Sequence, residues 1–250
     1  MMALAQDVKR KAFDAGFVCV GVTTPEALRD LPYGWVGKMR KLCSPEDEMS
    51  TCKSVVLLGF NAWDRAFNLS VNPPDWRGFG MHPPTARREH YLFYYEILRN
   101  RAWMVVDYLR RRGFESVHSL GIPLKTAAVK CGLGCQGKNT LLVTPQYGPR
   151  VRLISVLTEA EFDVDEPFKE DLCGDCERRI LACPTKAIEP YRLRIERCMT
   201  YSAESPCSPD VPDDVRRLDK KLVQRPTSNS YIECTICIEA CPLGKRHQRS

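Results

Sequence analysis

The chain has 250 residues, a length typical of one or two domains. Hydrophobic residues make up 44% and charged residues 27%, a composition that excludes a disordered chain, a collagen-like repeat and a coiled coil. The net charge of +6 permits an anionic partner without requiring one. No apolar stretch approaches the roughly 18 residues of a membrane span, and the N-terminus lacks an apolar signal core. We therefore expect a cytoplasmic protein with no membrane partner.

The first two thirds of the sequence alternate between helical and extended patterns. In chain order, the apolar spacing predicts a helix over residues 3–15, strands over 17–22 and 54–60, a long helix over 91–112, a short helix over 127–131, and strands over 141–144 and 151–157. Residues 70–84 contain four prolines and two glycines, so we expect a long loop of the kind that often forms a lid or binding loop. This order of elements predicts an α/β or α+β layered domain.

The composition changes near residue 159. The segment 163–167 is acidic and contains a proline, as many linkers do. We therefore expect two domains, residues 1–165 and residues 166–250. The second domain contains eight of the thirteen cysteines and is interrupted by prolines, so its core is expected to be inorganic rather than hydrocarbon.

The cysteines stand at short fixed spacings. Disulfides are rare in a cytosolic chain, so metal ligation or redox chemistry is the better interpretation. One run, CGDCERRILACP, begins at Cys173; a second, CTICIEACP, begins at Cys234. Both match parts of the bacterial ferredoxin run Cys-x-x-Cys-x-x-Cys-x-x-x-Cys-Pro, whose fourth cysteine ligates the other cluster. A Cys-x-x-Cys turn directs two thiolates and several N–H groups into one concavity, which suits an anionic iron–sulfur core.

Exchange of cysteines between the two runs predicts two iron–sulfur sites. Site B takes a complete set of four thiolates: Cys183, Cys198, Cys234 and Cys237. Site A takes three: Cys173, Cys176 and Cys241. Its fourth patterned position is Arg179, and a guanidinium does not replace a thiolate ligand. Site A is therefore expected to be one ligand short, with a three-iron cluster, an iron carrying an exogenous ligand, or a thiolate recruited from Cys207.

A structural zinc site is the alternative, since two Cys-x-x-Cys pairs could bind one zinc ion through four thiolates. The number of cysteines and the two Cys-Pro endings favour iron–sulfur clusters over zinc. The other cysteines are expected to be small buried hydrophobes. For Cys131 and Cys135, which flank a glycine turn, a redox or ligand role is the second possibility.

That glycine turn lies in the segment KCGLGCQGKNTLLVTPQYGPRVRLISVLTE, residues 130–159. Gly132, Gly134 and Gly137 leave backbone space for a planar or phosphorylated ligand, although a tight turn without a ligand is commoner. Followed by an acidic linker and paired cysteine runs, the segment is similar to the epoxyqueuosine reductases and corrinoid reductive dehalogenases. The resemblance is strong over residues 122–242 and weaker upstream.

The resemblance implies a nitroreductase-like domain that binds cobalamin, followed by a ferredoxin-like domain whose two 4Fe–4S clusters supply it with electrons. The implied cofactor contacts are Gly132, Gly134, Gly137, Lys138, Asn139, Leu141, Arg150 and Arg152. Arg150 and Arg152 suit ion pairs across a sheet edge equally well. The implied partners are a low-potential electron donor of the ferredoxin or flavodoxin type and a small-molecule or corrinoid substrate.

The chain departs from this family at several points that bear on the substrate. The reductases carry a catalytic acid about a dozen positions before the glycine turn, and this chain has no carboxylate there after Glu115. The tRNA-binding helical repeats of the reductases and the twin-arginine leader of many dehalogenases have no counterpart. We therefore expect a short member of the family, for which nucleic acid is not a partner.

Two residues are candidates for the proton donor that reductive bond cleavage requires. His118 stands near the position of the family's acid, and Tyr94 is one of three tyrosines on the long helix, for which core packing is the default. The first functional interpretation is a cobalamin-dependent iron–sulfur reductase. The second is an electron carrier or corrinoid-reducing partner with no substrate of its own.

Overall fold

The computed structural model describes residues 2–245 except 32, 37–39, 84 and 86–89. At its centre is a four-stranded sheet in the order β1-β4-β10-β7, in which every neighbouring pair is antiparallel. The strands are β1 (Cys19–Thr23), β4 (Ser54–Asn61), β10 (Val151–Thr158) and β7 (Ser116–Ser119). Because the sheet is antiparallel, the mixed helix and strand arrangement is of the α+β kind.

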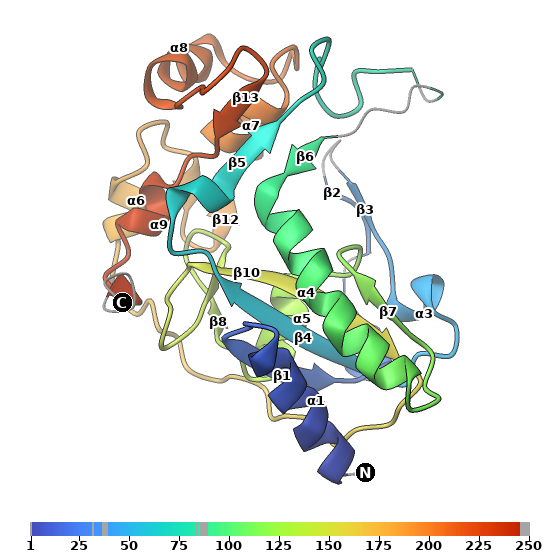
Figure 1. Ribbon diagram of the computed structural model, residues 1–250. Helices are drawn as coiled ribbons and strands as arrows, with labels where there is room; N and C mark the ends of the chain where they lie inside the picture. Colours follow the sequence, from blue (N-terminus) through green and yellow to red (C-terminus); the bar gives the residue numbers. More distant parts are fainter. Residues whose placement is uncertain (1, 32, 37–39, 84, 86–89, 246–250) are drawn as a thin grey trace.

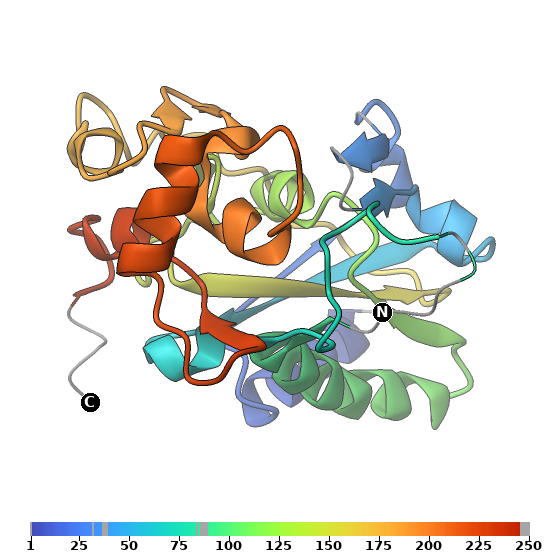
Figure 2. The same ribbon diagram turned by 90° about the horizontal axis from the view of Figure 1, so that it is seen from above.

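Helices cover both faces of this sheet. The helices α1 (Met2–Asp14) and α4 (Phe93–Arg110) lie on one side and α5 (Leu124–Lys130) on the other (Figures 1 and 2). The eight residues of β4 are all buried, and they alternate between the two faces. Val56, Leu58 and Phe60 pack towards α1 and α4, whereas Val55 and Leu57 pack towards α5. Because both faces of β4 are buried, its sequence is a nearly continuous run of apolar residues.

The predicted helices and strands of the first two thirds are confirmed, with small shifts at their ends. The short helix predicted over 127–131 begins three residues earlier, at Leu124, and the long helix begins at Phe93 because Tyr91 and Leu92 form the short strand β6 (Tyr91–Leu92). None of the helices in the described part of the chain is long and apolar enough to cross a membrane.

The smaller elements of the first two thirds are short. They are α2 (Pro25–Leu28), β2 (Gly34–Val36), β3 (Arg40–Leu42), α3 (Pro45–Glu48), η1 (Arg65–Asn68), β5 (Leu69–Val71), β8 (Cys135–Gln136) and β9 (Leu142–Val143). Those of the last third are α6 (Arg178–Leu181), β11 (Ile188–Glu189), β12 (Arg192–Leu193), η2 (Ile195–Arg197), α7 (Met199–Glu204), α8 (Asp213–Leu222), β13 (Ser230–Ile232) and α9 (Ile236–Glu239). The last third thus combines short helices and strands with the ten-residue α8, and it contains a buried apolar cluster around Met199, Val215 and Tyr231 where an inorganic core alone was expected.

A second sheet joins the two parts of the chain. Strand β13 of the last third pairs with β5, and β5 pairs with β6, to give the order β13-β5-β6 (Figure 1). The acidic segment around Asp165 is also fixed, since its carboxylate accepts hydrogen bonds from Lys9 Nζ at 2.6 Å and from the Val22 amide at 2.8 Å. The expected boundary near residue 165 is therefore crossed by a shared sheet, and the linker is bound to the first part.

The proline-rich segment 70–84 binds to the last third of the chain as far as it is described; residue 84 lies outside the described residues. Trp76 donates from Nε1 to the Glu204 carbonyl at 2.5 Å, and Arg77 accepts from the Cys207 amide at 3.1 Å. Its first residues, Ser70 and Val71, belong to β5. The segment is a loop as predicted, and these contacts hold it against α7.

His90 should make the protein less stable as the pH falls from about 6.5 towards 4. It packs against Trp76, Phe79 and Tyr231, and burial lowers the pKa of its imidazole from 6.5 to about 4. The unfolded chain therefore takes up the proton first, so stability that is present above pH 6.5 is lost on acidification. We expect about 2 kcal/mol of this loss between pH 7 and pH 5, absent in His90→Phe. Urea unfolding at both pH values measures it; equal losses in the two proteins would contradict it.

Candidate metal centre

The four cysteines of site B come from separate elements and meet. Cys183 follows α6, Cys198 occupies the N-cap position of α7, and Cys234 and Cys237 stand at the start of α9. Burial raises the pKa of the Cys234 thiol to about 12, and the charges of the other three cysteines add to this rise. Cys198 and Cys234 pack on the same apolar cluster, and the short helices α6 and α9, next to Cys183 and Cys237, contact each other, so the structure places the four cysteines in one region.

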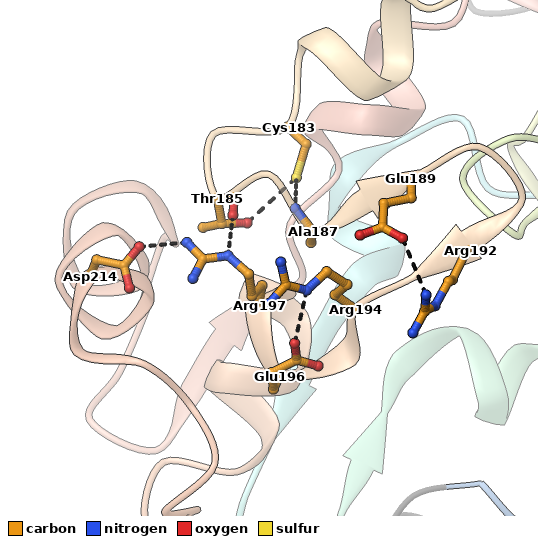
Figure 3. Close-up of polar contacts among 9 residues, drawn as sticks. All are labelled: Cys183, Thr185, Ala187, Glu189, Arg192, Arg194, Glu196, Arg197 and Asp214. Atoms are coloured by element: carbon orange, nitrogen blue, oxygen red, sulfur yellow. Dashed lines mark hydrogen bonds and ion pairs between the residues drawn. The ribbon is translucent and has the colours of Figure 1, made fainter.

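The loop that presents Cys183 is braced by arginines. The Cys183 sulfur accepts a hydrogen bond from the Ala187 amide at 3.3 Å and lies 3.5 Å from the Thr185 hydroxyl (Figure 3). Arg197 donates to the Thr185 carbonyl at 2.7 Å and to the Asp214 carboxylate at 2.6 Å, which ties the loop to α8 (Figure 3). Hydrogen bonds to sulfur of this kind orient a thiolate ligand and tune the potential of a cluster.

Site A contains one feature that ordinary ferredoxin sites lack. Cys173 and Cys176 share a turn, closed by a hydrogen bond from the Cys176 amide to the Cys173 carbonyl at 2.8 Å. Arg179 is only 5% exposed and donates from Nη2 to the Cys173 sulfur at 2.6 Å. The guanidinium that replaces the patterned thiolate is therefore directed at a thiol of the same site.

Asn139 connects the two sites. Its Oδ1 accepts a hydrogen bond from Arg179 Nη1 at 2.6 Å, and its Nδ2 donates to the Cys237 sulfur at 3.5 Å. A continuous chain of hydrogen bonds thus runs from Cys173 of site A through Arg179 and Asn139 to Cys237 of site B. Asn139 was expected to contact a bound cofactor in the first domain; here it lies between the two sets of cysteines.

The third cysteine of site A, Cys241, is buried and followed by Leu243, whose carbonyl accepts a hydrogen bond from Arg150 at 2.7 Å. Burial lowers the pKa of the Arg150 guanidinium, and the charge of Cys241 acts to raise it. Leu243 also packs on the buried pair Cys135 and Cys173. Arg150 could either bind an anion or pair within the protein, and its hydrogen bond to the Leu243 carbonyl is a contact within the protein.

The donor set of site B fits an iron–sulfur cluster, because four thiols converge from four positions in a partly buried setting. In the described part of the chain, no group of three or more His, Cys, Asp or Glu side chains is arranged to hold a single metal ion. Site A offers three patterned thiols and a cation.

The glycine turn is closed by the protein's own atoms. A Cβ at Gly134 would collide with the Val143 carbonyl, and one at Gly137 would lie 2.7 Å from Arg179 Nη2. At Gly132 it would lie 2.6 Å from the Glu166 carbonyl. The backbone space at these glycines is therefore filled by the β8–β9 hairpin, Arg179 and the linker. Close packing against the protein's own atoms therefore accounts for these three glycines, and cofactor contact at the turn stays a prediction.

The other residues expected to contact a cofactor make hydrogen bonds and ion pairs within the protein. The Lys138 carbonyl accepts from the Tyr191 amide at 3.0 Å, and the Leu141 carbonyl accepts from the Gly137 amide at 2.8 Å. Arg152 pairs with Glu233 at 3.2 Å and hydrogen-bonds to Asn68. Arg150 and Arg152 both line a small cleft between the first part of the chain and α9.

Tyr94, a candidate proton donor, belongs to the same buried network as Arg152. It is 6% exposed, its hydroxyl lies 3.4 Å from Glu233 Oε1, and the Arg152 guanidinium lies 4.5 Å from the centre of its ring. Burial raises the pKa of Tyr94 well above its usual value, and the charge of Glu233 raises it further. This hydroxyl is thus engaged at the contact between α4 and the segment before Cys234.

His118, the other candidate, lies on strand β7. Its ring makes an edge contact with Trp103 of α4, with ring centres 5.6 Å apart, whereas its neighbour Val117 packs on the α5 side. Burial lowers the pKa of His118, and the charge of Arg99 lowers it further. Because α5 leads into the glycine turn, His118 and that turn lie on opposite faces of the sheet. The structure does not bring His118, Tyr94 and the glycine turn into one site.

From the sequence, Cys135 was expected to be a buried hydrophobe, with a ligand role only as the second possibility. The structure places it beside Cys173. Both are buried with Val143 in one cluster, and the Cys173 charge is among the influences that raise the pKa of Cys135 after burial. The signal available in the sequence was a cysteine inside the glycine turn together with a missing cysteine at position 179. Cys207, the recruit considered for site A, is exposed, and its amide is bound to Arg77.

Comparison with known proteins shows what the chain resembles. No family model matches it. Epoxyqueuosine reductase of Bacillus subtilis (strain 168) is 30% identical over 61% of this chain and 38% of that protein. Epoxyqueuosine reductase of Atelocyanobacterium thalassa (isolate ALOHA) is 24% identical over 100% of this chain and 82% of that protein. The similarity therefore extends along the whole chain.

Solved structures agree. A crystal structure of epoxyqueuosine reductase with an epoxyqueuosine-modified tRNA stem loop superposes with a TM-score of 0.69 at 23% identity, over 97% of this chain and 66% of that one. A reductive dehalogenase, described with a mechanism for B12-dependent dehalogenation, gives 0.57 at 17% identity, over 88% and 34%. The first of these relatives is seen with RNA, which runs against the expectation that nucleic acid is not a partner. The resemblance inferred from the cysteine runs and the glycine segment is confirmed: the chain is similar in sequence to epoxyqueuosine reductases along its full length and shares its fold with them and with reductive dehalogenases.

Proposed function

We propose that this protein is an iron–sulfur reductase, in which a nitroreductase-like part receives electrons from a ferredoxin-like part. The observation that carries the proposal is the convergence of four thiols at site B, linked through Asn139 and Arg179 to Cys173 of site A. Bound iron–sulfur clusters supply one-electron transfer. The chain's own contribution is to hold the thiolates, to donate hydrogen bonds to sulfur and to limit the access of water.

The test is anaerobic purification of the whole chain, with iron, acid-labile sulfide and zinc quantified per chain. We expect iron and sulfide in equal amounts, broad visible absorption, and bleaching of that absorption by a low-potential donor of the ferredoxin or flavodoxin type. Stoichiometric zinc without iron, in a protein that has no visible absorption, would establish the zinc alternative and overturn the proposal.

Cobalamin is proposed as the electron acceptor on the strength of the dehalogenase relative, whose description names B12. A bound corrinoid would supply low-valent cobalt chemistry. The close contacts at Gly134 and Gly137 account for these glycines without a ligand, so no contact with the corrinoid is assigned to them. Equilibrium dialysis of the cluster-loaded protein against cobalamin tests binding; retention of one cobalamin per chain is expected.

The substrate is proposed to be either a small molecule or a modified RNA, because a similar reductase is seen with a tRNA stem loop. The net charge of +6 is compatible with both. Single-turnover assays with an epoxyqueuosine-bearing stem loop and with small halogenated or epoxide substrates distinguish them. The same stem loop without the modification is the control for non-specific binding.

The carrier function is kept as a second candidate because of one observation. The protein's own atoms fill the glycine turn, where the family resemblance places the cofactor. A protein that transfers electrons to an external corrinoid needs no such cradle. Reduction of free cobalamin without turnover of either class of substrate would favour this candidate.

A further inference from the structure

Site A lacks a thiolate at position 179, and the structure holds another thiol close to it. We propose that Cys135, from the glycine turn of the first domain, supplies the fourth thiolate of site A. This inference rests on the proposed iron–sulfur function. It assigns to site A a ligand that lies outside the two cysteine runs and comes from the opposite side of the domain boundary.

The position of Cys135 carries the first step. Cys135 is 7% exposed and packs with Cys173, itself 6% exposed, in one buried cluster. Leu243, two residues after Cys241, packs on the same cluster. The Cys135 sulfur also accepts a hydrogen bond from the Leu172 amide at 3.4 Å, directly before Cys173. The thiol therefore lies among the chain segments that present the patterned cysteines of site A.

The local backbone holds Cys135 in this place. Cys135 pairs with Val143 across the β8–β9 hairpin, which a hydrogen bond from the Gly137 amide to the Leu141 carbonyl closes at 2.8 Å. Gly134, with φ of +159°, lets the Val143 carbonyl approach at the residue before the thiol. A tight hairpin fixes the direction of its side chains, so Cys135 is prepared for ligation rather than free to turn away.

The buried positive charge of Arg179 provides a second, independent observation. The Arg179 guanidinium is buried, and no Asp or Glu of the described part of the chain lies within ion-pair distance of it. Its partners are the Cys173 sulfur and the Asn139 amide oxygen. A buried unpaired cation is expensive, whereas an iron–sulfur core held by four thiolates is anionic and would neutralise it. Arg179 thus points to an anionic group at site A.

The other spare cysteines nearby do not suit this role. Cys207 is exposed beside Arg77. Cys131 is 2% exposed, contacts Gly21 of β1 and donates to the Ala128 carbonyl, within the core between α5 and the sheet. Cys135 alone among these three packs on Cys173. Ligation by Cys135 would also connect the first domain to the cluster domain through the metal.

The test compares Cys135→Ala with Cys131→Ala, its matched control on the other side of the glycine turn. The whole chain is purified anaerobically, and iron, sulfide and the paramagnetic spectrum are measured. We expect about eight irons in the parent and in Cys131→Ala, the content of two four-iron clusters. Cys135→Ala should lose at least one iron of site A and show the spectrum of a three-iron cluster or of site B alone.

A second variant keeps the proposal falsifiable if Cys135→Ala is merely unstable. Adding Arg179→Cys to Cys135→Ala returns a thiolate to the patterned position and should restore the iron content of the parent. The proposal is overturned if Cys135→Ala retains the iron and spectrum of the parent, or if Cys207→Ala loses them instead. A parent with only about four irons, all lost in Cys198→Ala, would overturn it while leaving the proposed function intact. An iron-free parent would instead overturn the proposed function.

Discussion

Replacing Cys198 by alanine should remove the cluster of site B and destabilise the last third of the chain. Cys198 occupies the N-cap position of α7 and packs with Cys234 onto the cluster of Met199, Val215 and Tyr231. Because metal binding at such a site is also folding free energy, we expect a loss of about four irons and of at least about 3 kcal/mol. Iron analysis and thermal unfolding measure both, and the corresponding fall in Tm is about 6–12 °C.

Cys52→Ala is the matched control. Cys52 is buried in the core between α5 and the sheet, donates to the Ser54 carbonyl at 3.4 Å, and packs in a different cluster from those that contain Cys198 and Cys173. Its loss should cost about 1 kcal/mol and no iron. Iron content and a paramagnetic spectrum that remain unchanged in Cys198→Ala would show that site B is wrongly assigned.

The fold of the first part could be read from the sequence wherever burial is continuous or periodic. The strand β4 was predictable because all of its eight residues are buried, and α4 because its apolar residues recur at helical spacing. The pairing of β13 with β5 was not predictable. Each strand has three residues, and Ser230 and its partner Val71 are far apart in the sequence, so no local pattern marks them. Short strands depend on their tertiary setting.

The candidate site shows the same division between local and long-range information. The spacing within each cysteine run is local, and the ferredoxin pattern, in which the two runs exchange ligands, predicted that Cys183 and Cys198 would lie near Cys234 and Cys237. The glycine pattern was ambiguous, since Gly134 leaves space that either a ligand or the protein can fill, and here the Val143 carbonyl fills it. The bridge from Asn139 to Cys237 joins residues 98 positions apart, and no spacing in the sequence encodes it.

The arginines near the site illustrate why residue type alone does not decide function. Arg150 directly precedes β10 and Arg152 lies on it, and both side chains suit either an anionic ligand or internal pairing. The contacts of Arg150 with the Leu243 carbonyl and of Arg152 with Glu233 tie the central sheet to the segments that flank the second cysteine run. Their buried surroundings favour the role of holding the two parts of the chain together.

Arg152→Leu should be among the most destabilising substitutions in the chain. Glu233 is 4% exposed, directly precedes Cys234, and receives hydrogen bonds from Arg152 at 3.2 Å and Tyr94 at 3.4 Å. Burial raises the pKa of the Glu233 carboxyl, and the guanidinium lowers it. Removing Arg152 leaves a buried carboxylate without its cation, which typically costs about 3–5 kcal/mol. Urea unfolding of the parent and the variant at pH 8 measures the difference.

Two further measurements distinguish the loss of the Arg152–Glu233 ion pair from a simple loss of packing. In Arg152→Leu the pKa of Glu233 should rise further, so the folded state gains a proton that the unfolded state lacks, and the variant should recover stability as the pH falls from 8 towards 5. The double variant Arg152→Leu, Glu233→Leu removes both charges and should be more stable than Arg152→Leu alone, because no unpaired charge remains. Tyr94→Phe, which removes one hydrogen bond to Glu233, should cost only about 1 kcal/mol. The effects of the single variants Arg152→Leu and Glu233→Leu on the free energy of unfolding could instead add up to that of the double variant at every pH. Arg152 and Glu233 would then act independently, and the contact between β10 and the second cysteine run would not depend on their charges.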